Sequence, residues 1–210
     1  MSFWHFMLQN RGQVLELTLE HIWLVAISTL LAVLIGIPLG ILITRWPRLN
    51  KPVLGATNII QTIPSLALFG FLLPAPWIGE RADRLAILAL MLYALLPLIR
   101  NTYAGIQGID PAVVEAGRSM GMTDRQLLFQ VELPLSLGVI VAGVRVATVI
   151  SIGLATIAAA IGAGGLGEFI FRGLAMVSNA VILAGAIPAA LLAIVADLGL
   201  GWLEKRLSHR

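Results

Sequence analysis

The charged segment at residues 110–134 holds the side chains best suited to contact another protein. Its sequence is DPAVVEAGRSMGMTDRQLLFQVELP, in which apolar residues alternate with six charged ones: Asp110, Glu115, Arg118, Asp124, Arg125 and Glu132. Such charges form directed hydrogen bonds and ion pairs with a partner surface. We therefore expect recognition by another protein, because the rest of the chain is almost entirely apolar.

The loop at 105–135 that contains this segment is predicted to form two short helices. Asp110 is a suitable N-cap and Pro111 suits the first helical position, where its missing N–H would be unpaired anyway. Gly121 is placed to end the first helix in a left-handed conformation. Small and apolar side chains give this helix a low face on which a partner could approach closely: Val113, Val114, Ala116, Gly117 and Met120.

The second short helix is predicted to begin at Thr123. Thr123 and Gln126, three residues later, form a capping box, and we expect Pro134 to close the unit before the next apolar run. The plainer alternative is a solvated loop that only joins two apolar segments. A glycine between two capped helices favours a docking role over that alternative.

The composition places the chain in a membrane. Of the 210 residues, 59% are hydrophobic and 12% are charged, whereas soluble domains carry about 25% charged residues. We predict a single all-α integral membrane domain over 1–210, with about five apolar runs near the 20 residues that one crossing requires. These predicted spans are 21–44, 53–76, 85–104, 136–160 and 178–203.

Basic residues predict the orientation of these spans. With the N-terminus outside, nine lysines and arginines fall in cytoplasmic segments: Arg45, Arg48, Lys51, Arg100, Arg118, Arg125, Lys205, Arg206 and Arg210. Only four fall outside: Arg11, Arg81, Arg84 and Arg172. The positive-inside rule thus places the N-terminus outside and both loop 105–135 and the C-terminus in the cytoplasm. The same location beside apolar runs argues against a nucleic-acid role for these residues.

Polar side chains inside the spans are candidates for a wetted path. One set falls at helical spacing in the second span, and two more residues follow in the fourth: Asn58, Gln61, Thr62, Ser65, Thr148 and Ser151. Polar groups at membrane depth are costly and often functional. They either line a path for a polar solute or hold helices together by hydrogen bonds.

Two charges, Arg145 and Asp197, lie within the predicted spans. Arg145 is about 12 Å from the cytoplasmic start of its span and Asp197 about 8 Å from the cytoplasmic end of its own. Because an unpaired charge at this depth is unfavourable, we predict a structural ion pair between the two helices.

No motif gives this chain an ATP or metal chemistry of its own. It lacks the phosphate-binding G-x-x-x-x-G-K-[ST] sequence. Gly162, Gly164 and Gly167 spell G-x-G-x-x-G, but they follow an apolar span instead of a strand, so a dinucleotide site is not expected. We expect a flexible turn there, with a gate or a plain loop as alternatives. The three histidines show no metal-ligand spacing: His5, His21 and His209.

The loop resembles the cytoplasmic signature of permease subunits in binding-protein-dependent ABC importers, Glu-Ala-Ala, three residues, Gly, nine residues, Ile-x-Leu-Pro. This chain matches at Glu115, Ala116, Gly121, Leu133 and Pro134, with Gly117 and Val131 as mild departures. Three further segments resemble the branch that imports glycine betaine, choline and carnitine: QTIPSLALFGFLLP (61–74), LPLIRNTYAGIQGIDPAVVEAGRSMGM (96–122) and ATIAAAIGAGGLGEFIFRG (155–173).

The resemblance implies a type I importer permease that is not itself an enzyme. It implies that the loop is a coupling helix for a separate ATPase, present in two copies, which binds ATP and magnesium. The residues carried over for that role are Glu115, Ala116, Gly117, Arg118, Gly121, Leu133 and Pro134.

A second permease copy or a related permease, and a separate substrate-binding protein, complete the importer that the resemblance implies. Its location would be the cytoplasmic (inner) membrane of a bacterium or archaeon. Two alternatives remain: an ABC permease for another small polar solute such as an amino acid, or an ATP-independent carrier.

Overall fold

The computed structural model describes residues 3–76, 79 and 81–208, and these form helices and turns without a strand. His209 and Arg210 lie outside the described residues. Four helical stretches are long and apolar enough to cross a membrane. They are α2 (Arg11–Arg45), α5 (Ala82–Gln107), α8 (Leu133–Ala158) with the helical turns before and after it, and α10 (Asn179–Ser208). The expectation of an all-α membrane fold is confirmed.

The predicted second span, 53–76, is not one helix. α3 (Pro47–Thr62) and α4 (Ser65–Leu72) meet at a bend of 103°. The cause is Pro64, which has no backbone N–H and disfavours helical geometry at the preceding residue. Ile63 accordingly adopts an extended conformation, with ψ at 126°. The prediction that Ser65 shares one helical face with the polar residues of α3 is therefore wrong.

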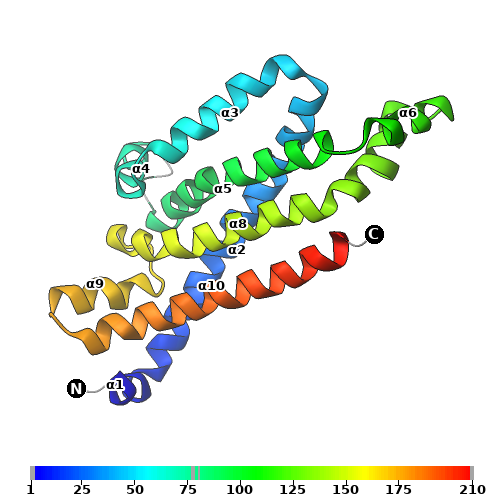
Figure 1. Cartoon of the computed structure of the whole chain (residues 1–210). Helices are drawn as coiled ribbons and strands as arrows, with labels where there is room; N and C mark the ends of the chain where they lie inside the picture. The colour runs from blue at the N-terminus through cyan, green and yellow to red at the C-terminus, as the bar shows by residue number, and fades with distance from the viewer. Residues whose placement is uncertain (1–2, 77–78, 80, 209–210) are drawn as a thin grey trace.

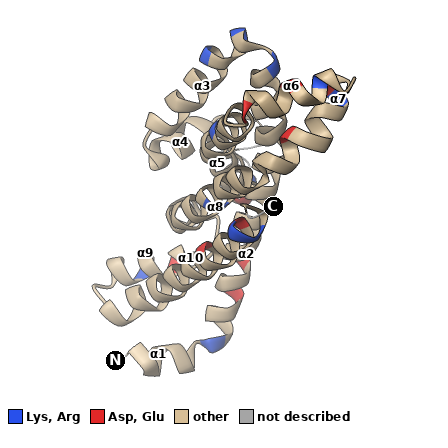
Figure 2. Cartoon of the chain, turned by 45° about the vertical axis from the view of Figure 1, so that its right-hand side comes forward, with Lys and Arg blue, Asp and Glu red and all other residues tan. Residues whose placement is uncertain are grey.

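The helices place four parts of the chain at one end of the molecule (Figure 1): the end of α2, the start of α3, the segment around α6 (Pro111–Ser119), and the C-terminal end of α10. We call this the loop end. The opposite end carries α1 (Phe3–Gln9), α4 and α9 (Gly167–Ala175), and we call it the glycine-turn end after residues 162–167. Figure 2 shows lysines and arginines gathered mainly at the loop end.

Helix α5 forms the centre of the fold and packs against both α2 and α8. Glycines allow the close approach of α2, since a Cβ on Gly36 would lie 2.9 Å from Leu98 Cβ and one on Gly40 would lie 2.5 Å from Thr102 Cβ. Small residues four apart are the usual way in which membrane helices pack closely. The two glycines thus let α2 approach α5 more closely than any larger residue at these positions would allow.

Candidate functional site

Helix α6 is closed at both ends by local hydrogen bonds. The Asp110 carboxylate accepts a hydrogen bond of 2.9 Å from the Ala112 N–H, and Pro111 occupies the first turn. At the other end Gly121 has φ +82°, and the Met122 N–H reaches the Gly117 carbonyl at 3.1 Å. This is the Schellman arrangement, in which a left-handed glycine lets the last carbonyls find partners. The end groups of α6 are therefore satisfied within the loop itself.

The second helix of the loop also begins as the sequence predicts. Thr123 and Gln126 form a capping box before α7 (Asp124–Leu127). However, α7 does not end before the next span: it continues through a wide π turn, Leu128–Glu132, directly into α8. Pro134 lies in the first turn of α8, so the prediction that it closes a separate unit is wrong. Proline lacks an N–H and its ring crowds the carbonyl of the preceding helical turn, and here it directly follows the widened π turn.

One residue of the predicted docking face of α6, Gly117, lies on the opposite, buried face. Gly117 is buried, and a Cβ there would lie 2.7 Å from Leu127 Cδ1 and 3.3 Å from Met122 Sδ. Gly117 therefore packs α6 on α7 instead of facing a partner, and its predicted place on the docking face is wrong. The exposed face carries Glu115, Ala116 and Arg118.

Leu133 and Pro134 lie at the base of the loop, where α8 begins. Leu133 is half-buried and Pro134 is exposed. Arg118 makes a long ion pair of 3.9 Å with Asp124, and both side chains are largely exposed. Such surface pairs contribute little to stability, so Arg118 remains available to a partner.

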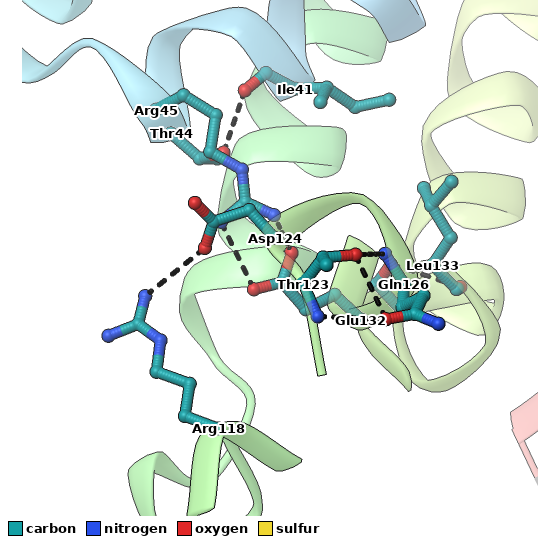
Figure 3. A network of polar contacts seen from close by, with 10 residues as sticks. Ile41, Thr44, Arg45, Arg118, Thr123, Asp124, Gln126, Glu132 and Leu133 are labelled. Carbon is teal, nitrogen blue, oxygen red and sulfur yellow. Dashed lines mark hydrogen bonds and ion pairs between the residues drawn. The ribbon is translucent and has the colours of Figure 1, made fainter. Parts of the chain in front are cut away.

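An ion pair that the sequence analysis missed, between a buried glutamate and a half-buried arginine, attaches the loop to α2. Glu132, the last residue of the π turn, is 4% exposed. Both of its carboxylate oxygens accept hydrogen bonds from Arg45, the last residue of α2, with Arg45 Nη1 at 3.2 Å from Oε1. Figure 3 shows this pair beside the capping box. Because the partners are far apart in sequence, no spacing could reveal it.

Two of the three predicted pathway residues of α3 contact α5. Gln61 donates a 2.9 Å hydrogen bond to the Tyr93 carbonyl, and Asn58 accepts one of 3.0 Å from Arg100. Thr62 donates to its own helix and is exposed. Two of the four predicted pathway residues of this segment thus hold helices together, and a wetted path along them stays a prediction.

The polar residues of α8 lie in different surroundings. Thr148 donates to the Val144 carbonyl and lines an apolar groove of about 530 Å³ between α2, α8 and α10. Ser151 is fully buried, and its hydroxyl has no hydrogen-bond partner among the described residues. The structure therefore does not bring the two sets of predicted pathway residues into one polar surface.

The two charges within the spans do meet. Arg145 Nε lies 2.6 Å from Asp197 Oδ1, and Nη2 lies 3.1 Å from Oδ2. The sequence analysis missed a third group. Glu204, about two helical turns beyond Asp197 on α10, accepts a hydrogen bond of 3.1 Å from Arg145 Nη1. One arginine on α8 thus joins two carboxylates on α10.

The glycine turn is packed against α2. Gly162, Gly164 and Gly165 have positive φ angles, and the Gly165 N–H donates a 3.0 Å hydrogen bond to Glu20. Beside it, a ring nitrogen of buried His21 lies 3.1 Å from the Ile152 carbonyl. No strand precedes this turn in the described part of the chain, so the setting of a dinucleotide site is missing.

A family model extends over nearly the whole of this architecture. The model for the inner membrane component of binding-protein-dependent transport systems matches residues 18–209. The chain belongs to this family. It is a multi-pass membrane permease, and the resemblance seen in its loop is confirmed.

Several relatives of the permease are named as permease proteins for glycine betaine, carnitine, choline or osmoprotectants. It is 51% identical to a glycine betaine/carnitine/choline transport system permease protein, OpuCD, of Bacillus subtilis, over 95% of this chain and 86% of the relative. It is 47% identical to an osmoprotectant import permease protein, OsmW, of Salmonella typhimurium, over 97% of this chain and 94% of that protein. A carnitine transport permease protein, OpuCB, of Listeria monocytogenes is 44% identical, over 98% and 93%.

Solved structures share the fold of the permease. A chain of the MetNI methionine ABC transporter, in an inward facing conformation, matches with a TM-score of 0.86 and 23% identity, over 95% of this chain and 98% of that one. A chain of an amino acid ABC transporter matches with a TM-score of 0.75 and 19% identity, over 100% and 99%. At this identity the likeness establishes the ABC importer permease fold and nothing about substrate.

Proposed function

We propose that the permease imports small quaternary-amine osmoprotectants, of the glycine betaine, choline and carnitine type, with energy from a separate ATPase. The substrate class is supported by two relatives whose names specify glycine betaine, carnitine or choline, and by a third that is named for osmoprotectant import. Two ATPase subunits would bind ATP and Mg²⁺, and two permease chains, identical or related, would form the pathway. A separate binding protein would deliver the solute.

One observation carries the proposal: the loop end presents a helix that is rigid and exposed at once. Caps and a Schellman turn close α6, and Gly117 packs it on α7. Its outer face, with Glu115 and Arg118, is left exposed. A preformed helix of this kind loses little conformational freedom when a partner binds it, which favours docking. We propose that the ATPase docks on this face.

The orientation follows from the same proposal. The ATPase is cytoplasmic, so α6 and the C-terminal end of α10 would face the cytoplasm, and the N-terminal end of α2 would face the outside. The gathering of basic residues at the loop end supports this orientation through the positive-inside rule (Figure 2).

Gly121→Asp tests the docking role. No atom lies within 4 Å of a Cβ on Gly121, and aspartate tolerates a left-handed backbone better than most residues, so the variant should fold. We expect it to lose co-purification with the ATPase and to lose uptake of glycine betaine. Gly162→Asp is the matched control, because Gly162 has φ +79° and equally empty surroundings at the opposite end.

The control variant should retain the ATPase. If Gly121→Asp also retains both the ATPase and uptake, the docking role is wrong. The substrate class has its own assay, in which the complete importer takes up labelled glycine betaine, choline, carnitine or methionine. Uptake of methionine alone would contradict the osmoprotectant assignment and leave the docking role intact.

A further inference from the structure

Helix α2 is attached near both of its ends to other parts of the fold by charged side chains. Arg45 at the loop end binds Glu132, and Glu20 near the other end accepts the Gly165 N–H. The two attachment points lie 25 residues apart on one helix, which is about 37 Å. A single element thus extends from the loop to the glycine turn.

The attachment at the loop end fixes the position of the π turn. Arg45 contacts both oxygens of the Glu132 carboxylate, which is 4% exposed. Removing Arg45 would leave the buried Glu132 carboxylate without its partner, which is unfavourable. Any displacement of the π turn should therefore carry the end of α2 with it.

The attachment at the glycine-turn end is a single hydrogen bond with close packing around it. A Cβ on Gly164 would overlap the Glu20 carboxylate, and one on Gly165 would lie 3.1 Å from His21 Nδ1. His21 itself is fully buried and contacts the Ile152 carbonyl of α8. The glycine turn thus rests directly on two adjacent residues of α2.

Helix α8 joins the same two regions covalently, but irregular helix lies at each of its ends. The π turn Leu128–Glu132 precedes it and a 3₁₀ turn, Ala159–Ile161, follows it. Irregular turns of these kinds often mark hinges. The Gly165 N–H lies beyond the 3₁₀ turn, so its contact with α2 bypasses that turn. Glu132 is the last residue of the π turn, so Arg45 binds the chain where this turn meets α8.

One weak point of α2 is held by its neighbour. Pro38 removes a backbone hydrogen bond within the helix. It lies between Gly36 and Gly40, at both of which an added Cβ would clash with α5. Contact with α5 on both sides of the proline limits bending at that turn.

We propose that α2 transmits displacement of the coupling loop to the glycine turn, and that Arg45, Glu132 and Glu20 are the positioning residues of this connection. The inference rests on the proposed docking of the ATPase at α6. It deepens that function by naming the path through which events at the ATPase reach the far side of the membrane.

The test uses the complete importer in proteoliposomes and measures solute taken up per ATP hydrolysed. Arg45→Gln and Glu20→Ala, which removes the acceptor of the Gly165 N–H, should each lower this ratio about fivefold or more, within the usual range of coupling between sites. If α2 connects the two points, the double variant should be no worse than the worse single variant. Effects at independent sites this far apart multiply to within about twofold, and that outcome would overturn the proposal.

Two controls exclude a general effect of lost charge. Glu16→Ala removes an exposed acid on the same helix, and Arg48→Gln changes an exposed arginine close to Arg45. Both should leave the ratio unchanged. The exchanged pair, Arg45→Glu with Glu132→Arg, should recover most of the ratio. A folded exchanged protein that binds the ATPase without such recovery also contradicts the proposal.

Co-purification of the ATPase is measured for every variant and separates the two ideas. Variants that bind and stimulate the ATPase while uptake per ATP stays at the wild-type value would refute the role of α2 and leave docking at α6 intact. Loss of docking on Gly121→Asp is a different observation, and its absence would refute the docking role itself.

Discussion

Replacing Gly40 by alanine should push α2 away from α5. A Cβ at this position would lie 2.5 Å from Thr102 Cβ and 3.1 Å from the carbonyl oxygen of Ile99. Carbon atoms prefer separations of about 3.5–4.0 Å, so one of the helices must move by about 1 Å. Neither obstacle can rotate away, because a Cβ and a carbonyl oxygen are fixed by the backbone of α5.

The magnitude follows from two opposing terms. Overpacking a close contact costs about 1–3 kcal/mol, whereas glycine to alanine inside a helix contributes about 0.5–1 kcal/mol of stability. Gly199→Ala in α10 provides only the second term, because no atom lies within 4 Å of a Cβ there. The difference between the two variants should therefore be about 1–3 kcal/mol.

Thermal unfolding of the detergent-solubilised permease measures this difference. A change of 1 kcal/mol shifts the midpoint by about 2–4 °C for a chain of this size, so Gly40→Ala should unfold several degrees below Gly199→Ala. Adding Thr102→Ala, which removes a methyl group 2.8 Å from the new Cβ, should recover part of the loss. Equal midpoints for the two single variants would refute the close α2–α5 contact.

Two further predictions concern polar groups in the spans. Arg145→Gln should lower the yield of folded permease, measured by size-exclusion chromatography, since Asp197 and Glu204 both lose their guanidinium partner. Adding Asp197→Asn and Glu204→Gln should restore this yield. No recovery would contradict the structural role of the three charged groups. Tyr93→Phe removes the hydroxyl that donates to the Ile63 carbonyl at the helix break, which should cost about 1–3 kcal/mol in thermal unfolding. An unchanged midpoint would show that this carbonyl finds another partner.

Local signals in the sequence predicted the loop well. Asp110, Gly121 and Thr123 act on their own neighbours, so the cap, the left-handed turn and the capping box follow from spacing alone. The error at Gly117 has a different origin. Whether it faces a partner or α7 depends on how the chain folds back at Gly121, which no local pattern specifies.

Contacts between distant segments could be predicted only where a charge had few possible partners. Arg145 and Asp197 were paired because each is isolated in an apolar run. Arg45 and Glu132 lie among other charges at the loop end, so their selective pairing emerges only in three dimensions. The break at Pro64 was also underestimated, because prolines are common in these spans and the sequence does not show that the helix direction changes there by 103°.

The helix break also sets a relation between the permease and the thickness of its bilayer. α3 contains 16 residues, about 24 Å of helix, whereas the hydrocarbon interior of a bilayer is about 30 Å thick. α4 turns aside and adds little to this height. Lipids beside α3 must therefore compress or the helix ends must be wetted, each at a modest cost per ångström. The stability of this fold should thus depend on the acyl-chain length of the surrounding lipids, separately from any ligand or nucleotide.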